Sequence, residues 1–459
     1  MSKFKKIISI SLFAGFAGFA AYVNNQALAD GELKSEVPLN SHGAVDVNAH
    51  VPLEVQIPMA PKDQINPVPK SLAGKFSNDL PAQPNLNVKS YLLTAANSNQ
   101  IIASYNSYKR VPPASLAKLM LIYIVEQHLA SGDLKLDQKI RVPKVAWATG
   151  GSRMFLKPGS YVSVKELING TLVASGNDAA VTLAVHIAGT QDSFVHLMNS
   201  EAKKLGMNNT RYATVMGLPA PNEYTCAYDL SLLARSIMLN YPQYFPWFKQ
   251  KWITHNDIKQ PNYNKLLFIY PDATGMKTGS TSYAGYSLVG TAKEDGNPMP
   301  LIAVVLGADN RMASANGAKA LLKYGFHFFK SKLFYSDKKL IKQVPLYLGK
   351  KDLISVGVTK PIWVSYPKDL KDKVQAQLKV DKNLKAPIKK GQVLGKVIFS
   401  VKNSVDSEAG DSDGYMNSKN NKKKHDDILL KSVPVVSMED INLGGLFKRT
   451  KDHVKLWWS

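Results

Sequence analysis

The sequence predicts an α+β protein with an antiparallel sheet, followed by a small all-β region and a terminal amphipathic helix. Two observations carry this prediction. Strand-like runs stand at both ends of residues 83–334, with a block of helical patterns between them. After residue 334, short β-rich runs alternate with turn residues, and the last twenty residues carry an apolar stripe at helical spacing.

Residues 1–29 have the pattern of a secretory signal peptide. Lys3, Lys5 and Lys6 precede an uncharged apolar stretch from 7 to 23, and the small residues Ala27 and Ala29 offer a cleavage site. An uncleaved membrane anchor is the alternative, because this stretch is near the shortest length that spans a bilayer. Either outcome predicts export of the remaining chain. Residues 30–82 are proline-rich and are expected to form an extended linker.

The region 83–334 supplies the predicted catalytic domain. Strands are expected at 89–93 and 100–104, and Pro112-Pro113 opens a helix over 116–129 that is apolar on every face and therefore buried. Ser163 and Glu166 form a capping box, and a break at Ser175-Gly176 precedes a helix over 177–187. The remaining expected elements are helices at 191–205, 228–239 and 318–329 and strands at 282–292 and 301–306.

The region 335–437 is expected to form a β-rich domain, with strands at 362–364, 374–378, 393–399 and 429–436 and a low-complexity insertion at 403–427. In residues 438–459, apolar side chains recur every three or four positions opposite lysine and arginine. This pattern is typical of a helix lying in the headgroup region of a membrane. Packing of the stripe on the protein's own β domain is the alternative.

Charge and cysteine content limit the function classes. The net charge of +23 is compatible with binding to nucleic acid, with binding to an anionic membrane or polymer, or with a basic surface that is simply solvated. Because the basic residues are spread out and no nucleic-acid-binding motif occurs, we expect no nucleic-acid partner. Cys226, the single cysteine, precedes an apolar helical run and is expected to be a buried structural thiol. The nine histidines form no ligand-spaced cluster, so no metal or other cofactor is expected.

Three short motifs carry the candidate chemistry: Ser115-Leu116-Ala117-Lys118, Ser175-Gly176-Asn177 and Lys277-Thr278-Gly279. Each alone also fits a structural role, as a helix start, a cap or a turn before a strand. Their order and local settings favour a catalytic site. Ser115 and Lys118 begin a buried helix, where a solvated lysine fits poorly.

The spacing of Ser115 and Lys118 explains how such a site would work. Positions i and i+3 of a helix are neighbours, so the Lys118 amine can reach the serine hydroxyl. An ammonium cannot accept a proton, so Lys118 has to be kept neutral by burial and by a nearby cation, for which Lys277 is the candidate. The helix N-terminus would favour an oxyanion at Ser115.

From residue 85 onward the chain resembles the low-molecular-mass penicillin-binding proteins that are serine D-alanyl-D-alanine carboxypeptidases. The resemblance rests on the stretches Pro113–Lys118, Ser152–Gly159, Ser175–Ala180 and Leu197–Gly206, and on Gly275–Gly279 with the following Thr281-Ser282 and Ala284–Tyr286. It implies a penicillin-binding/transpeptidase-like catalytic domain, a β domain and a C-terminal amphipathic helix.

The resemblance also implies roles for individual residues. Ser115 attacks the penultimate D-alanine carbonyl of a peptidoglycan stem peptide, and Lys118 takes the proton. Ser175 relays a proton to the leaving D-alanine. Substrate is held by Asn177, Lys277, Thr278 and Gly279, with backbone N–H groups of Ser115 and Ser280 as the oxyanion hole. β-Lactams would acylate Ser115 and act as covalent inhibitors. The expected location is the periplasmic face of the inner membrane, with peripheral attachment through the C-terminal helix.

Three alternatives stay open. A DD-endopeptidase would use the same residues, and a weakly active wall-binding scaffold would keep them without turnover. A class A β-lactamase needs a deacylating glutamate, and Glu201, the one tempting carboxylate, lies in an ordinary amphipathic helix pattern. Relatives often use an arginine beyond the Lys-Thr-Gly strand to hold the substrate carboxylate. Arg311 lies in that region at a position that looks shifted, so its role is left undecided.

Overall fold

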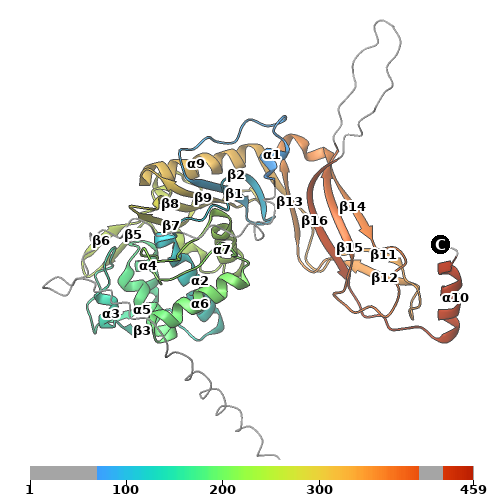
Figure 1. The fold of residues 1–459 in the computed structure, drawn as a ribbon, viewed down its shortest axis with the longest axis horizontal. Helices are drawn as coiled ribbons and strands as arrows, with labels where there is room; N and C mark the ends of the chain where they lie inside the picture. The colour runs from blue at the N-terminus through green and yellow to red at the C-terminus, as the bar shows by residue number, and fades with distance from the viewer. Residues whose placement is uncertain (1–69, 403–426, 458–459) are drawn as a thin grey trace, which may run out of the picture. The chain divides into compact units, whose positions relative to one another are not determined.

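A computed structural model describes residues 70–402 and 427–457 (Figure 1). The predicted signal peptide, most of the predicted linker and nearly all of the 403–427 insertion lie outside the described residues.

The predicted catalytic region is built on one antiparallel sheet of five strands in the order β2-β1-β9-β8-β7. Its strands are β1 (Ser90–Ala95), β2 (Gln100–Tyr105), β7 (Ala273–Thr281), β8 (Gly285–Ala292) and β9 (Leu301–Ala308). The two ends of the region thus supply the sheet, and the helical block is inserted between β2 and β7. This arrangement confirms the predicted α+β class.

The helical block packs against one face of the sheet, and α9 (Arg311–Phe328) covers the other (Figure 1). The block consists of η2 (Ala114–Ala117), α2 (Lys118–Ser131), α3 (Lys144–Trp147), α4 (Val164–Leu172), α5 (Asn177–Ala188), α6 (Gln191–Lys204) and α7 (Ala227–Asn240). Shorter elements complete the region: α1 (Leu72–Lys75), η3 (Phe245–Lys249), α8 (Leu266–Ile269) and the hairpins β3 (Lys139–Arg141)–β4 (Tyr161–Ser163) and β5 (Trp252–His255)–β6 (Ile258–Pro261).

Helix α2 forms the centre of this domain, as its apolar sequence predicts. The nine residues from Lys118 to Glu126 are all buried. The helix ends at Gly132, whose φ of +86° is a left-handed conformation that glycine adopts without a steric penalty. The predicted capping box at the start of α4 is present, since Glu166 N donates to Ser163 Oγ and Ser163 N donates back to Glu166 Oε2.

The β region contains a five-stranded sheet in the order β11-β12-β16-β15-β14 and a separate pair, β10-β13. The strands are β10 (Phe329–Tyr335), β11 (Leu340–Pro345), β12 (Leu353–Gly357), β13 (Ile362–Pro367), β14 (Val374–Val380), β15 (Val393–Val401) and β16 (Ile428–Ser437), with η4 (Lys368–Lys373) between β13 and β14. Helix α10 (Leu446–Trp457) follows. None of the helices in residues 70–402 and 427–457 combines the length and the hydrophobicity that spanning a bilayer requires.

Three details differ from the sequence-based expectation. The folded region extends into the predicted linker, because α1 lies at 72–75 and Leu72 and Phe76 are buried in the core. Strand β10 begins at Phe329 and pairs with β13, so the β region starts before residue 335. Lys277 was expected to precede a strand and instead lies in the middle of β7, because β7 pairs with β8 from Ala273 to Thr281.

Candidate active site

The fold brings the three motifs together at the junction of the helical block and the sheet. Ser115 lies in η2, one turn before the first residue of α2, Lys118. Ser175 and Asn177 lie at the break between α4 and α5, and Lys277 lies on β7. Hydrogen bonds among these side chains join the segments into one cluster, as the sequence predicted.

Two residues of the cluster's backbone adopt a conformation that L-amino acids rarely hold. Ala114, just before Ser115, has a φ of +48°, and Ser175 has a φ of +53°. Such outliers concentrate at functional sites, where the surroundings hold them in place. At Ala114 the surroundings include Gly217, where an added Cβ would lie 1.8 Å from the Ala114 carbonyl oxygen. The glycine therefore permits the turn that presents Ser115.

Lys118 is the hub of the cluster. Its fully buried Nζ atom lies 2.9 Å from Ser115 Oγ, 2.6 Å from Asn177 Oδ1 and 3.0 Å from the Ser175 carbonyl oxygen. A neutral amine has two N–H donors and one lone pair. The amide and carbonyl oxygens can only accept, so they use both donors, and the lone pair is left for the Ser115 hydroxyl proton. The arrangement suits a general base.

The electrostatic surroundings favour the neutral form of Lys118. Burial lowers the pKa of its ammonium well below the ordinary value, and the charge of Lys277 lowers it further. The Asp178 carboxylate opposes this shift by a smaller amount. Ser115 itself is only half-buried, so its hydroxyl is accessible while the Lys118 amine is shielded from solvent.

Lys277 connects the sheet to the other two motifs. Its Nζ donates to Ser175 Oγ at 2.9 Å and to the Thr278 carbonyl oxygen at 2.9 Å. Burial lowers its pKa to about 7, and the charge of Arg311 contributes to the shift. Ser175 Oγ also lies 3.4 Å from Lys118 Nζ. The Ser175 hydroxyl therefore lies between the two lysine nitrogens, where a proton can be passed.

Strand β7 presents the third motif next to Ser115. An added Cβ at Gly279 would lie 3.0 Å from both Leu116 N and the Pro113 carbonyl oxygen. A side chain at this position would push η2 and β7 apart by a few tenths of an ångström, so glycine suits the close approach of the two elements. Thr278 is half-buried and Ser280 is exposed. Within the described sheet β7 is an edge strand, so its outer side can face a substrate peptide.

Asp178 is a supporting residue that the sequence analysis did not single out. Its carboxylate accepts from Met154 N at 2.8 Å and from Leu156 N at 3.0 Å, and so fixes the 154–156 loop beside the cluster. Asn177 is held similarly, because its Nδ2 donates to the Gly150 carbonyl oxygen at 2.6 Å. In the sequence, Asp178 is marked only as an acidic residue at the start of a buried helix. That feature by itself indicates only helix capping.

Other candidate groups lie outside the cluster. Cys226 is fully buried and caps α7, and burial raises the pKa of its thiol well above the ordinary value, which confirms the structural interpretation. Glu201 lies on α6, where it accepts from Gln127 Nε2 and pairs with Lys204. In the parts of the chain that the structure describes, no group of three or more His, Cys, Asp or Glu side chains could hold a metal ion.

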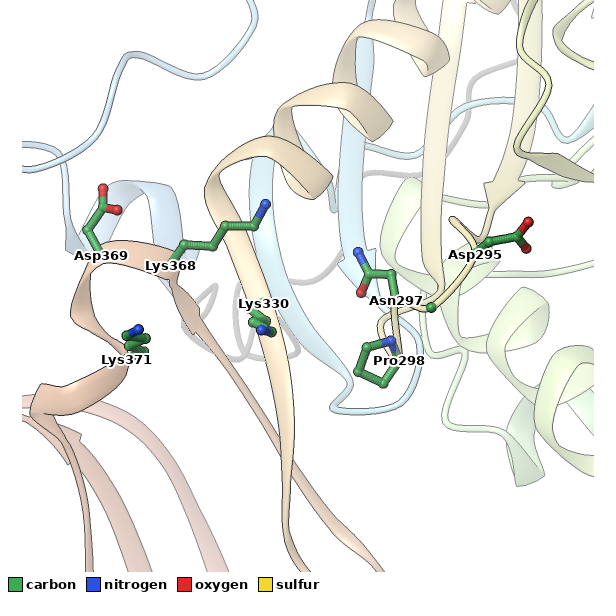
Figure 2. A pocket seen from close by; sticks show the side chains of 8 residues that line it. Asp295, Asn297, Pro298, Lys330, Lys368, Asp369 and Lys371 are labelled. Carbon is green, nitrogen blue, oxygen red and sulfur yellow. The ribbon is translucent and has the colours of Figure 1, made fainter.

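A cavity of about 560 Å³ lies away from the cluster (Figure 2). It is lined by Asp295, Gly296, Asn297, Pro298, Lys330, Lys368, Asp369 and Lys371. Its side chains are lysines and aspartates with an asparagine and a proline, without a nucleophile paired to a base. The chemistry described above belongs to the Ser115 cluster.

Comparison with known proteins identifies the family of this chain. Residues 77–310 match the family described as D-alanyl-D-alanine carboxypeptidase, and residues 329–442 match the C-terminal domain of penicillin-binding protein 5. The chain is 35% identical to D-alanyl-D-alanine carboxypeptidase DacC of Escherichia coli K12 over 81% of this chain and 89% of the relative. DacA of the same strain is 34% identical over 82% of this chain and 89% of that relative.

Solved structures agree in fold. Penicillin-binding protein 5 from Haemophilus influenzae superposes with a TM-score of 0.71 at 33% identity, covering 79% of this chain and all of that one. DacD from Francisella tularensis superposes with a TM-score of 0.63 at 29% identity, covering 80% of this chain and 96% of that one. With a serine–lysine cluster assembled as the sequence resemblance implies, and with relatives that match it across both domains, this chain belongs to the D-alanyl-D-alanine carboxypeptidase family of penicillin-binding serine peptidases.

Proposed function

We propose that this protein removes the terminal D-alanine from peptidoglycan stem pentapeptides through an acyl-enzyme on Ser115. The observation that carries the proposal is the placement of Lys118 Nζ, which is buried, held by two acceptor oxygens and 2.9 Å from Ser115 Oγ. A serine hydroxyl needs such a base to become a nucleophile. The family shown above carries the name of the same activity.

Acylation would proceed in two steps. Ser115 Oγ attacks the carbonyl carbon of the penultimate D-alanine while its proton passes to Lys118 Nζ. The backbone N–H groups of Ser115 and Ser280 would hold the resulting oxyanion. The carbon–nitrogen bond then breaks, and the leaving amine takes a proton through Ser175 Oγ, which lies within reach of both lysines.

Deacylation uses the same groups in reverse. A water molecule gives a proton to Lys118, attacks the ester carbonyl and releases the shortened peptide and the Ser115 hydroxyl. Asn177 and Gly279 would hold the peptide beside the cluster, Thr278 would hold the terminal carboxylate, and the Lys277 ammonium would stabilise charge near Ser115. A β-lactam would open on Ser115 by the same attack and remain as a covalent inhibitor.

The purified protein without its first 29 residues tests this activity. Incubation with a stem pentapeptide should release one alanine, as measured by mass spectrometry, and Ser115→Ala should release none. Failure of the wild type to cut the pentapeptide, together with cleavage of cross-linked dimers, would establish an endopeptidase instead. Failure on both substrates with intact penicillin binding would establish a wall-binding scaffold.

We also propose that α10 attaches the exported protein to the periplasmic face of the inner membrane. Phe447 and Val454, two turns apart, are 94% and 57% exposed, and Lys451 and Lys455 lie nearby on the helix. Exposed apolar side chains with adjacent lysines suit an interface with anionic lipid. The helix is held by the buried Asp452 carboxylate, which accepts from Leu348 N and from Lys448 Nζ, both at 2.8 Å.

Vesicle sedimentation tests the membrane proposal. The protein should sediment with vesicles that contain anionic phospholipid, and the double variant Phe447→Ser/Val454→Ser should not, while both keep the same catalytic activity. Equal sedimentation of the two proteins would refute attachment through this face of α10. A Leu353→Ser variant, which removes an exposed apolar side chain of β12, is the matched control.

A further inference from the structure

Trp252 and Phe268 form an exposed pair of aromatic rings on the surface of the predicted catalytic region. Trp252 is the first residue of β5 and is 47% exposed, and Phe268 lies in α8 and is 40% exposed. The ring centroids lie 6.0 Å apart at an interplanar angle of 86°, which is the edge-to-face geometry that aromatic pairs prefer. The pair therefore keeps a defined shape while both side chains remain open to a ligand.

Three lysines hold their ammonium groups against these two rings. Lys259 Nζ lies 5.0 Å from the Trp252 ring centroid, and the Nζ atoms of Lys251 and Lys265 lie 5.5 and 5.7 Å from the Phe268 ring centroid. Among the described residues, no carboxylate lies within 4.0 Å of any of the three ammonium groups. These five residues, called the Trp252 patch below, combine exposed rings with uncompensated positive charge.

Hydrogen bonds hold the segments that carry the Trp252 patch. Asn262, which follows the β5–β6 hairpin, is buried, and its backbone N donates to the Lys251 carbonyl oxygen at 2.7 Å. Its Nδ2 donates to the Gln250 carbonyl oxygen at 2.8 Å. The buried Asn264 accepts at Oδ1 from Leu266 N at 3.1 Å and so fixes the start of α8. The patch is therefore preformed, and a ligand would not have to order it.

The Trp252 patch adjoins the strand that carries the Lys-Thr-Gly motif. Helix α8 packs against β7, and the chain passes from α8 directly into β7. Between β6 and α8, the Tyr263 ring carries a further cation, because the Arg311 guanidinium carbon lies 4.5 Å from its centroid. A polymer bound to the patch would therefore lie next to the strand that contributes Lys277 to the Ser115 cluster.

The exposure of the two rings favours a polymer that lies along the surface over a lipid bilayer. In α10, which is proposed to lie on the membrane, Phe447 is 94% and Trp457 is 82% exposed, so these rings project from the protein. Trp252 and Phe268 are far less exposed and lie along the surface instead. A sugar ring stacks its C–H groups on such a ring, and a carboxylate pairs with an ammonium group beside it. A glycan that carries carboxylates satisfies both kinds of group.

We propose that the Trp252 patch binds the glycan strand of peptidoglycan, with sugar rings on Trp252 and Phe268 and carboxylates of the stem peptides on the three lysines. The net charge of +23 favours the approach of such an anionic polymer. The inference deepens the proposed function and rests on it for the identity of the polymer. Its consequence is a preference for polymeric peptidoglycan, because the strand makes contacts that a free pentapeptide lacks.

Co-sedimentation with insoluble peptidoglycan tests the proposal. The stems of the peptidoglycan already lack the terminal D-alanine, so the Ser115 cluster has no bond to cut. Replacing Lys251, Lys259 and Lys265 together by Gln should raise Kd about 3- to 30-fold, in line with the loss of three exposed ion pairs. Trp252→Ala/Phe268→Ala should raise Kd roughly 5- to 50-fold, and Trp252→Phe should bind nearly as well as wild type. Peptidoglycan with amidated carboxylates should bind wild type and the triple lysine variant equally.

Matched variants separate the patch from net charge and from folding. Replacing Lys135, Lys144 and Lys203 by Gln removes the same charge from exposed lysines elsewhere, and Tyr161→Ala removes a ring that is 63% exposed. Both should bind peptidoglycan as wild type does, and the triple lysine variant of the patch should keep the wild-type Tm. Equal weakening by the two lysine triples would overturn the proposal, and so would unchanged binding of both patch variants.

Two further measurements distinguish the glycan strand from other ligands. Wild type and patch variants should sediment equally with vesicles of anionic phospholipid, and a loss confined to vesicles would assign the patch to the membrane and overturn the proposal. The ratio of kcat/KM on pentapeptide-bearing peptidoglycan to kcat/KM on free pentapeptide should fall in the patch variants. If wild type releases alanine from neither substrate, the carboxypeptidase proposal fails, while sedimentation still decides the role of the patch.

Discussion

The Oδ1 atom of Asn177 lies 2.6 Å from the Nζ atom of Lys118, the shortest of the four contacts that this nitrogen makes. An amide oxygen at this distance accepts an N–H group without adding a full negative charge. The asparagine therefore orients the amine while leaving it neutral. A carboxylate in the same place would stabilise the ammonium and consume the lone pair that Ser115 needs.

Asn177→Asp should therefore convert the base into a permanent cation at neutral pH. We expect the rate of penicillin acylation to fall by about 100-fold or more at pH 7, since an adjacent opposite charge raises a lysine pKa by about one to three units. Part of the rate should return as the pH is raised toward 10. Asn177→Ala, which adds no charge, should lack this alkaline recovery. Matching pH profiles for the two variants would contradict the account.

Lys277→Met should remove activity and increase stability. The folded pKa of about 7 lies below the ordinary value of 10.5, so the folded state binds fewer protons than the unfolded state between these pH values. Wild-type stability therefore rises with pH across that window, and the cost of the buried charge is largest below pH 7. The Tm advantage of Lys277→Met should be greatest near pH 6 and shrink by pH 9. Calorimetry at several pH values measures it, and an advantage that grows with pH would exclude a buried ammonium.

Gly217→Ala should shift the position of Ser115, although the two residues are far apart in the sequence. The added Cβ would meet the Ala114 carbonyl oxygen at 1.8 Å, and the φ of +76° at Gly217 adds strain. We expect slower acylation of Ser115 and a lower Tm. Gly132→Ala is the matched control, because its φ is +86° but nothing lies within 4 Å of the added atom. It should cost about 1–2 kcal/mol of stability and leave acylation unchanged. Equal behaviour of the two variants would show that the Ala114 contact is unimportant.

Glu126 should make the catalytic domain less stable as the pH rises. Burial in α2 raises its pKa to about 9, and neither carboxylate oxygen has a hydrogen-bond partner in the described structure. Between pH 4.5 and 9 the folded state holds a proton that the unfolded state releases, so stability falls with rising pH. Glu126→Gln should remove this dependence and gain about 3 kcal/mol relative to wild type at pH 7. Asp133→Asn, at an exposed site, should show no such pH-dependent gain.

Much of the Ser115 cluster could be predicted from the sequence because residues close together in the chain determine its elements. The apolar helix after Pro113, the capping box at Ser163 and the order of the motifs located the cluster without knowledge of the fold. Lys277 was placed before a strand rather than within one, because glycines on both sides of it weaken a strand pattern. Pairing with the neighbouring strand stabilises β7, and no local sequence pattern predicts that pairing.

The supporting residues could not be identified in the same way. The contact of Gly217 with Ala114 and the stacking of Tyr263 on Arg311 join segments that are remote in the sequence. Asp178 looked like a helix cap until its carboxylate was seen to hold the 154–156 loop. Helix α9 starts at Arg311, seven residues before the helix expected from the sequence.

The most direct test of the central claim is to locate the acyl group. The protein is incubated with a penicillin, and its intact mass and proteolytic peptides are measured by mass spectrometry, with Ser115→Ala treated in parallel. The account predicts a single adduct on the peptide that contains Ser115 and none on the variant. An adduct on another residue, or one that persists in Ser115→Ala, would contradict the assignment of Ser115 as the nucleophile.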